Sequence, residues 1–290
     1  MKIGIQLYSV RNRMENDPID TIRKVAEAGY KHLEVANRDS YNDFGVGFGL
    51  TVQQTKDLLA ETGVEILGAH IVPFVEDTPL DKILEFHTEI GTKYIVQAID
   101  FFADKDELLR KTEQYNRIGE QCSKAGIQYL YHNHHHEFLC FDGVTIMELI
   151  MQNTDSDFVK LELDTYWACR GKQDPVEVMK KYGERVRIIH QKDYTKGYED
   201  EMDLLSHLEN SPTGFEDFMS YDSKGSASVK KESFTEIGTG ILPIQDYIDA
   251  ANKYCKCEYI VLEQDFSVHD EIDSIKISMG NFKKYTGVKW

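Results

Sequence analysis

Short β-prone runs alternate with amphipathic helical runs along most of this chain, at intervals of about 30 residues. The β-prone runs are Ile3–Ser9, His32–Ala36, Glu65–Ile71, Tyr94–Ala98, Ile127–Tyr131, Val159–Asp164, Val186–His190 and Glu258–Glu263. Helical patterns such as Leu80–Ile90, which ends at Gly91, follow them. This alternation predicts right-handed βαβ units and a parallel sheet. The length of 290 residues is close to the roughly 250 expected of a closed barrel plus insertions. We therefore expect an α/β fold, a (β/α)8 TIM barrel, with a single domain over residues 1–290.

The alternation breaks after the seventh β-prone run, where residues 194–235 replace a short loop. The first half of this segment is acidic, and the segment also carries Phe215, Phe218, Met219 and Tyr221. Long loops at the rim of a barrel are usually functional. We expect a rim insertion that acts as a lid over a substrate or as a docking segment for another subunit. A solvated loop with its own small apolar cluster is the alternative.

Charge and hydropathy exclude several classes of partner. The chain has 33 basic and 50 acidic residues, a formal net charge of −17, which disfavours nucleic acid because its phosphates would be repelled. A mean hydropathy of −0.46, with no run of about 18 apolar residues, argues against a membrane span. The N-terminus lacks a signal-peptide pattern, and the five cysteines include no CxxC pair. These features predict a cytoplasmic protein with reduced thiols.

Four polar residues lie at the ends of β-prone runs: Glu137 shortly after the fifth, Asp164 at the end of the sixth, His190 at the end of the seventh and Glu263 after Leu262. In a closed parallel barrel the carboxyl ends of the strands meet at one rim. Three carboxylates and one imidazole favour a hard or borderline divalent cation with open positions, Mn²⁺ or Mg²⁺ rather than a closed zinc site. Each residue alone has an ordinary alternative, as a helix cap, a core imidazole or a solvent-facing carboxylate.

Other residues near these strand ends are candidates for contact with a substrate. His134 could bond a substrate hydroxyl or act as an acid or base, although it could also simply cap its strand. Lys192 alternates with His190 and could bind an oxyanion at the barrel mouth, or be a surface lysine. Tyr166 and Trp167 could stack on a sugar ring or pack in the core. His70 ends the third run near the same rim.

Five segments together resemble the xylose isomerase-like TIM-barrel superfamily, in its sugar phosphate isomerase/epimerase branch. They are His132-Asn133-His134-x-x-Glu137-Phe138, Leu161-Glu162-Leu163-Asp164-Thr165-Tyr166-Trp167, His190-Gln191-Lys192-Asp193, Glu236-Ile237-Gly238-Thr239-Gly240 and Leu262-Glu263-Gln264-Asp265. The resemblance implies one divalent ion, Mn²⁺ first with Mg²⁺ or Co²⁺ as alternatives, bound by Glu137, Asp164, His190 and Glu263. It also implies that Glu137 and Glu263 exchange the proton and that His134 lines the site.

The predicted activity is proton abstraction next to a carbonyl of a sugar or sugar derivative, through an enediolate that a divalent ion stabilises. We expect a metal-dependent isomerase or epimerase with a small carbohydrate substrate. The first alternative is a lyase subunit that cleaves 3-oxo-glycosides by β-elimination, like the catalytic subunits of C-glycoside deglycosidases. A non-catalytic sugar-binding barrel is less favoured, and the net charge of −17 disfavours an endonuclease IV-like enzyme. The expected protein partners are a second copy of the chain or a small partner subunit.

Overall fold

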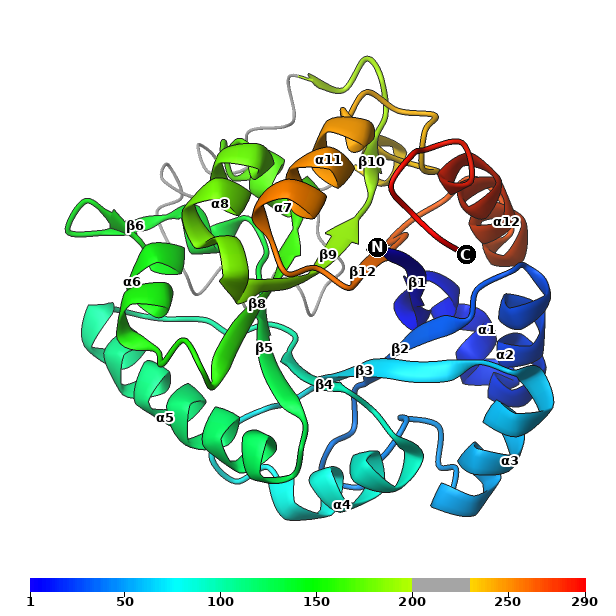
Figure 1. Ribbon diagram of the computed structural model, residues 1–290, viewed down its shortest axis with the longest axis horizontal. Coiled ribbons are helices and arrows are strands. Elements are labelled where there is room, and N and C mark those ends of the chain that lie inside the picture. The colour runs from blue at the N-terminus through cyan, green and yellow to red at the C-terminus, as the bar shows by residue number, and fades with distance from the viewer. Residues whose placement is uncertain (200–229) are drawn as a thin grey trace.

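Eight parallel strands close into a barrel in the computed structural model, which describes residues 1–199 and 230–290 (Figure 1). Around the barrel their order is β1 (Lys2–Gln6), β12 (Tyr259–Leu262), β9 (Val186–Gln191), β8 (Val159–Asp164), β5 (Gln128–His132), β4 (Tyr94–Gln97), β3 (Glu65–Ile71) and β2 (His32–Asn37). The barrel closes between β1 and β12, where Lys2 pairs with Tyr259 and Ile5 with Leu262. The predicted (β/α)8 barrel is confirmed.

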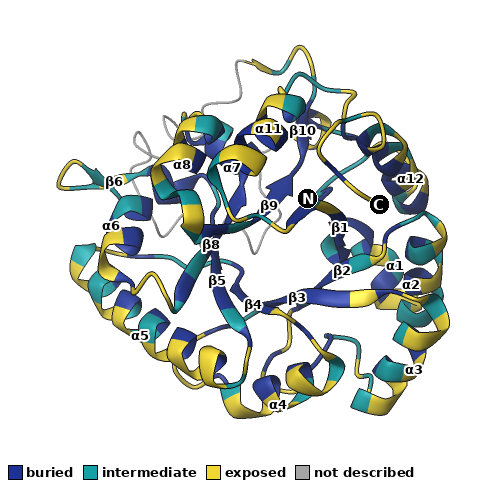
Figure 2. Cartoon of the chain, in the orientation of Figure 1, coloured by how far each residue is buried: buried dark blue, intermediate teal, exposed yellow. Residues whose placement is uncertain are grey.

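Helices surround the barrel and bury one face against it, while their outer faces are exposed (Figure 2). They are α1 (Arg11–Asn16), α2 (Pro18–Glu27), α3 (Val52–Thr62), α4 (Leu80–Ile90), α5 (Lys105–Lys124), α6 (Ile146–Asn153), α7 (Thr165–Arg170), α8 (Pro175–Tyr182), α11 (Ile244–Tyr254) and α12 (Glu271–Phe282). Local sequence sets several ends. Thr51 and Gln54 form a capping box at the start of α3, and Gly63 ends that helix in the left-handed conformation.

Short elements that the sequence pattern did not predict shape the loops at the rim. The first strand ends at Gln6 rather than Ser9, because the Gln6 side chain accepts a hydrogen bond from the Tyr8 backbone N–H and starts the 3-10 turn Leu7–Val10. The loop after β5 contains the 3-10 turn His136–Phe138 and a hairpin of β6 (Cys140–Phe141) and β7 (Val144–Thr145). A further 3-10 turn, Lys231–Ser233, precedes β11, whereas the turn Gly183–Arg185 precedes β9 at the other end of the barrel.

The interior of the barrel changes from apolar to polar along its length. Leu67, Tyr94, Val96, Leu130, Ile188, Tyr259 and Val261 form an apolar cluster. Side chains of a strand point to alternate faces, so inward positions run from Ile188 to His190 to Lys192, and from Leu130 to His132. Barrel interiors are usually filled by branched apolar residues. Here the layer above the apolar cluster carries buried charged and imidazole side chains, among them Glu34, His132 and Glu162.

The two ends of the predicted rim insertion, residues 194–235, lie side by side. β10 (Asp193–Tyr194) pairs antiparallel with β11 (Phe234–Thr235). Residues 200–229 lie outside the described residues, so the proposed lid or docking role of 194–235 stays a prediction. The carboxylate of Asp193 accepts hydrogen bonds from the backbone N–H groups of Gly238 and Gly240, both at 2.9 Å. This bond pair fixes the Glu-Ile-Gly-Thr-Gly segment beside β10.

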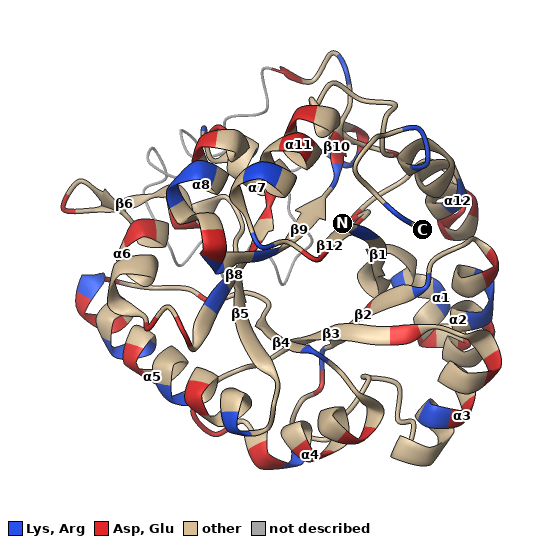
Figure 3. Cartoon of the chain, viewed as in Figure 1, with Lys and Arg blue, Asp and Glu red and all other residues tan. Residues whose placement is uncertain are grey.

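Acidic and basic side chains are interspersed on the outer helices (Figure 3). The ends of the chain lie together, since the Lys289 backbone N–H donates to the Met1 carbonyl at 2.8 Å. Over residues 1–199 and 230–290, no helix combines the length and apolar character needed to span a bilayer. The five cysteines are free thiols.

Candidate metal centre

Two overlapping groups of ligand-type side chains lie inside the barrel, among the residues that the structure describes. The rim group comprises His132, Asp164, His190 and Glu263, and the inner group comprises His70, His132, Glu162 and His190. In each group, one ligand atom per residue lies within 4.8 Å of the others, and all the side chains are buried. The two groups share His132 and His190, which therefore connect the carboxyl ends of the strands to the barrel interior.

The two carboxylates of the rim group bind a lysine ammonium. Lys192 Nζ lies 2.6 Å from Asp164 Oδ2 and also donates to Glu263 Oε2. The other oxygen of Asp164 accepts the Trp167 backbone N–H at 2.8 Å, so Asp164 also caps α7. His190 Nδ1 lies 3.0 Å from Glu263 Oε2. The Lys192 ammonium thus holds the two carboxylates of this group together.

The inner group is a network of imidazoles and carboxylates. Oε1 of Glu162 lies 2.7 Å from His70 Nε2, 3.0 Å from His132 Nδ1 and 3.0 Å from His190 Nε2. Glu34, on β2, borders this group, and its Oε2 lies 2.6 Å from His190 Nε2. Oε1 of Glu34 and Oε2 of Glu162 are buried, and the described residues offer neither a hydrogen-bond partner.

Burial and neighbouring charges shift the pKa values of this centre. Burial by itself would lower the pKa of His70, but the negative charges of Glu34 and Glu162 have the larger effect. Together these influences raise the pKa of His70 to about 10. Burial, with the charge of Glu34, raises the pKa of Glu162 to about 7. Although burial opposes the charged form, Asp164 and nearby acidic groups hold the pKa of Lys192 well above its ordinary value. Lys192 therefore carries its proton when no substrate is bound.

Glu137, the predicted ligand that follows β5, belongs to neither group. It lies on the 3-10 turn after that strand and is fully buried. Its carboxylate accepts hydrogen bonds from the Tyr131 hydroxyl at 2.9 Å and the His134 backbone N–H at 2.8 Å. From β5, His132 rather than Glu137 belongs to the rim group. The rim group therefore has two imidazoles and two carboxylates, whereas the sequence predicted one imidazole and three carboxylates.

Besides Lys192, the predicted substrate residues lie in three places. His134 and Trp167 lie near the rim group: their rings are 5.7 Å apart, and Lys192 Nζ lies 5.6 Å from the centroid of the Trp167 ring. Tyr166 is fully buried and stacks on Phe234 with ring centroids 4.8 Å apart, which is the core-packing alternative. His70 lies in the inner group.

Sequence reasoning missed three residues of this centre: His132, Glu34 and Glu162. A signal was present, because Glu34 and Glu162 each stand between two apolar residues of a strand, in Leu-Glu-Val and Leu-Glu-Leu. A charge in such a strand must be paired or exposed. His132 is the last residue of β5 and pairs with Glu162 in the sheet register.

The donor set fits a divalent cation. Four carboxylates, Glu34, Glu162, Asp164 and Glu263, are buried around the two groups, and buried charges are costly unless oppositely charged groups compensate them. Nitrogen and oxygen donors together suit borderline divalent ions. His190 directs Nδ1 to the rim group and Nε2 to Glu34 and Glu162. Since a neutral imidazole carries one proton, it can ligate through one nitrogen and donate through the other.

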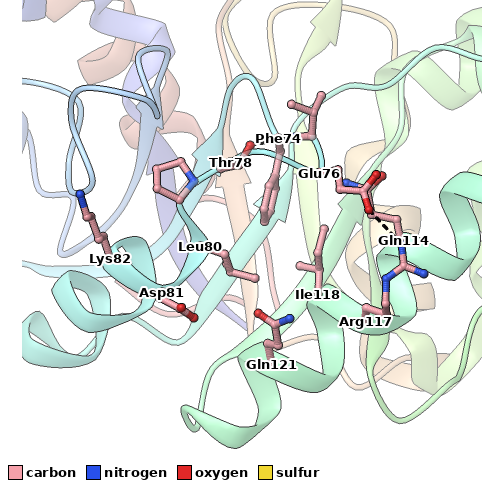
Figure 4. Close-up of a pocket in the computed structure, with 12 residues that line it drawn as sticks. Phe74, Glu76, Thr78, Leu80, Asp81, Lys82, Gln114, Arg117, Ile118 and Gln121 are labelled. Carbon is pink, nitrogen blue, oxygen red and sulfur yellow. Dashed lines mark hydrogen bonds and ion pairs between the residues drawn. The ribbon is translucent and has the colours of Figure 1, made fainter.

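A separate surface pocket of about 450 Å³ lies between α4 and α5 (Figure 4). Arg117 and Glu76 form a loose ion pair at one side of it, with a shortest separation of 3.9 Å. None of its lining residues belongs to the rim or inner group. The pocket is therefore distinct from the metal centre.

Comparison with known proteins relates this geometry to a family. A family model described as xylose isomerase-like TIM barrel matches residues 22–284. An inosose dehydratase of Lacticaseibacillus casei is 26% identical over 267 residues, which cover 83% of this chain and 80% of that protein.

Solved structures agree in fold. A sugar phosphate isomerase/epimerase from Parabacteroides distasonis is 26% identical with a TM-score of 0.75, covering 99% of this chain and 95% of that one. A structure described as IOLI protein with a bound zinc atom has a TM-score of 0.66 at 12% identity, covering 97% of this chain and 96% of that one. The chain belongs to the xylose isomerase-like TIM barrel family.

Proposed function

We propose that this protein is a metal-dependent enzyme that removes a proton next to the carbonyl of a keto-sugar or keto-cyclitol and then expels a β-hydroxyl as water. The observation that carries the proposal is the rim group, where Glu263 lies between His190 Nδ1 at 3.0 Å and the Lys192 ammonium. The inosose dehydratase relative, with 26% identity over most of both chains, supports this reaction class.

His132, Asp164, His190 and Glu263 are the proposed ligands. A divalent cation bound there would polarise the substrate carbonyl and stabilise the negative charge that develops on its oxygen. Mn²⁺ remains our first choice, with Mg²⁺, Co²⁺ and Zn²⁺ as ions to compare, since two imidazole and two carboxylate donors suit borderline metals. The zinc atom in the IOLI structure supports a divalent ion without selecting one.

Glu263 and Lys192 are the proposed base and acid. The carboxylate of Glu263 takes the proton from the carbon next to the carbonyl, and a carbon–carbon double bond forms as the β-hydroxyl leaves. The Lys192 ammonium gives that hydroxyl a proton, so water departs. The direct hydrogen bond between Lys192 and Glu263 then returns the abstracted proton to the lysine. Trp167 flanks this pair and offers an apolar face for the substrate ring.

Isomerisation or epimerisation is the second candidate, and the isomerase/epimerase from Parabacteroides distasonis favours it. Epimerisation by two bases needs a second carboxylate on the opposite face of the substrate. Glu137, predicted for that role, has its oxygens engaged by Tyr131 and His134 and is fully buried. This arrangement favours one base with an acid partner, and hence elimination, over exchange between two carboxylates.

Proton NMR in D₂O distinguishes these outcomes. The Mn²⁺-loaded protein is incubated with inososes, ketoses and 3-oxo-glucosides and removed before the spectra are recorded. Loss of water with a new unsaturated or tautomerised ketone supports the dehydratase. Deuterium next to the carbonyl in an otherwise intact or epimerised sugar indicates the isomerase or epimerase, and released aglycone indicates the glycoside lyase. No exchange with any compound contradicts the proposal.

Glu263→Gln should abolish turnover and deuterium exchange in this assay, because the amide cannot accept the proton. The matched control is Glu258→Gln, an exposed position one residue before the same strand. Normal exchange by Glu263→Gln at unchanged metal content would remove Glu263 from the proposed mechanism.

A further inference from the structure

We infer that Glu34 and Glu162 are positioning residues that fix the rings of His190 and His132 so that one nitrogen of each faces the rim group. The inference rests on the proposed metal site at that group. Neither carboxylate would touch the substrate, because both are fully buried below the rim group.

His190 is held from both sides of its ring. Its Nδ1 faces Glu263 of the rim group at 3.0 Å, and its Nε2 faces Glu34 at 2.6 Å and Glu162 at 3.0 Å. If Nδ1 ligates a cation, the ring proton must be on Nε2, where two carboxylate oxygens accept it. Carboxylates in this position orient a ligating imidazole and strengthen it as a donor.

His132 is held in the same way by Glu162. Its Nδ1 lies 3.0 Å from Glu162 Oε1, which leaves Nε2 as the nitrogen available to the rim group. The two residues are partners in the register of β5 and β8, so the backbone fixes the distance between them. One carboxylate oxygen therefore contacts both shared imidazoles, and a change at Glu162 should affect both proposed ligands.

The carboxylates themselves have little freedom. The Gln6 side chain donates to Glu34 Oε2 at 3.0 Å. On the other side, a Cβ at Gly68 would lie only 2.8 Å from Glu34 Oε1, so glycine leaves the space that this oxygen occupies. The His70 ring stacks on His190 with centroids 5.3 Å apart and planes 7° apart. These contacts make the inner layer a rigid support for the ligands above it.

The inner group could instead hold the cation itself, with His190 ligating through Nε2. His190 Nδ1 would then carry the proton and donate to Glu263. The two arrangements share the imidazoles of His132 and His190 but differ in which His190 nitrogen and which carboxylates are ligands. If the cation lies in the rim group, Asp164 is a required ligand and Glu162 only modulates the affinity. If the cation lies in the inner group, Glu162 is the required ligand and Asp164 only modulates the affinity.

Binding of Co²⁺ to the metal-free chain of 290 residues tests the inference, by calorimetry and by the visible absorption of the bound ion. Glu162→Leu removes the acceptor of the ring proton. Glu162→Gln and Glu34→Gln keep an acceptor oxygen but lose the charge. Asp164→Asn removes a proposed ligand. Glu236→Gln is the matched control, because Glu236 is a buried carboxylate bonded to Ser267 and Ser274, outside both groups.

We expect Glu162→Leu to weaken Co²⁺ binding about 10- to 100-fold and to shift the visible absorption bands, since the imidazoles lose their orientation. The two glutamine variants should lose less, because an amide oxygen still accepts the ring proton. Asp164→Asn should bind least, and Glu236→Gln should bind like the wild type. If Glu162→Leu proves poorly folded in thermal melts, the two glutamine variants carry the comparison.

Three results would overturn the inference, and they bear differently on the proposed function. Wild-type affinity and absorption in the Glu162 and Glu34 variants, with binding lost in Asp164→Asn, would reject the positioning role and leave the metal site intact. Binding lost in Glu162→Gln but retained in Asp164→Asn would place the cation in the inner group. Unchanged binding in all variants would reject the metal site itself and, with it, the proposed function.

Discussion

Replacing Lys192 by methionine would remove the ammonium that, within the described structure, joins Asp164 to Glu263. Lys192 is 1% exposed and Asp164 is fully buried, so solvent cannot replace the lost partner. Removing one member of a buried ion pair costs about 3–5 kcal/mol. We therefore expect the metal-free variant to lose about that much of its free energy of unfolding.

The expected shift in melting temperature follows from chain length. An unfolding entropy of about 2.1 cal/mol/K per residue gives about 0.6 kcal/mol/K for 290 residues. A loss of 3–5 kcal/mol then lowers the melting temperature by about 5–8 °C. Calorimetry of EDTA-treated wild type and Lys192→Met measures this shift. Lys124→Met is the control, because Lys124 is exposed and its pair with Glu120, at 2.8 Å, lies at the surface, where such pairs contribute about 0–1 kcal/mol.

Adding Mn²⁺ should narrow the difference between Lys192→Met and wild type, because the metal supplies positive charge to the same two carboxylates. A ligand present at 100 times its dissociation constant stabilises a protein by about 2.7 kcal/mol. Lys192→Met should reach this stabilisation at a lower Mn²⁺ concentration than the wild type does. If metal-free Lys192→Met melts within about 2 °C of the wild type, the buried pair is not formed in solution. If Mn²⁺ stabilises the variant less than the wild type, the metal does not bind at these carboxylates.

Two further predictions concern the scaffold. Burial lowers the pKa of His87 to about 4, below its unfolded value of about 6.5, so the stability that its neutral ring contributes is present above pH 6.5 and is lost as the pH falls toward 4. Between pH 7 and pH 5 the loss of unfolding free energy is about 2 kcal/mol. Urea unfolding at the two pH values should show this loss in the wild type and not in His87→Gln. An equal pH dependence of stability in both proteins would refute the prediction. Gly240→Ala should destabilise the rim by about 2 kcal/mol or more, because its Cβ would lie 2.3 Å from Asp193 Oδ1. Gly280→Ala, in α12 where a Cβ meets nothing within 4 Å, should be neutral or stabilising by up to about 1 kcal/mol; equal losses in both would contradict the steric argument.

Local sequence determined much of the scaffold. The alternation of β-prone and helical runs predicted the barrel, and the bounds Glu65–Ile71, Val159–Asp164 and Leu80–Ile90 are those of β3, β8 and α4. Such segments are readable because propensity, periodicity and terminal glycines agree within a few residues. The proximity of Asp164, His190 and Glu263 was also predicted from sequence, since residues at the ends of parallel strands meet at one rim whatever the details of packing. Their role as metal ligands stays a prediction.

The position of Glu137 depended on a turn that the sequence pattern did not reveal. Tyr131 precedes the inward-facing His132, so its ring points to the opposite face of the sheet and packs against Tyr115 of α5. The 3-10 turn after β5 brings the Glu137 carboxylate to the Tyr131 hydroxyl. The direction of a loop five residues beyond a strand depends on such tertiary contacts.

Only the tertiary structure placed Glu34 and Glu162 beside His190. The three residues come from β2, β8 and β9, and β2 is separated from β9 by β1 and β12 around the barrel. Strands of a parallel barrel are buried on both faces, so their composition does not show which residues point inward. Closure of the barrel and the register of its strands bring these two carboxylates to the same imidazole. The distances between the strands follow from closure and register, and no local sequence pattern encodes them.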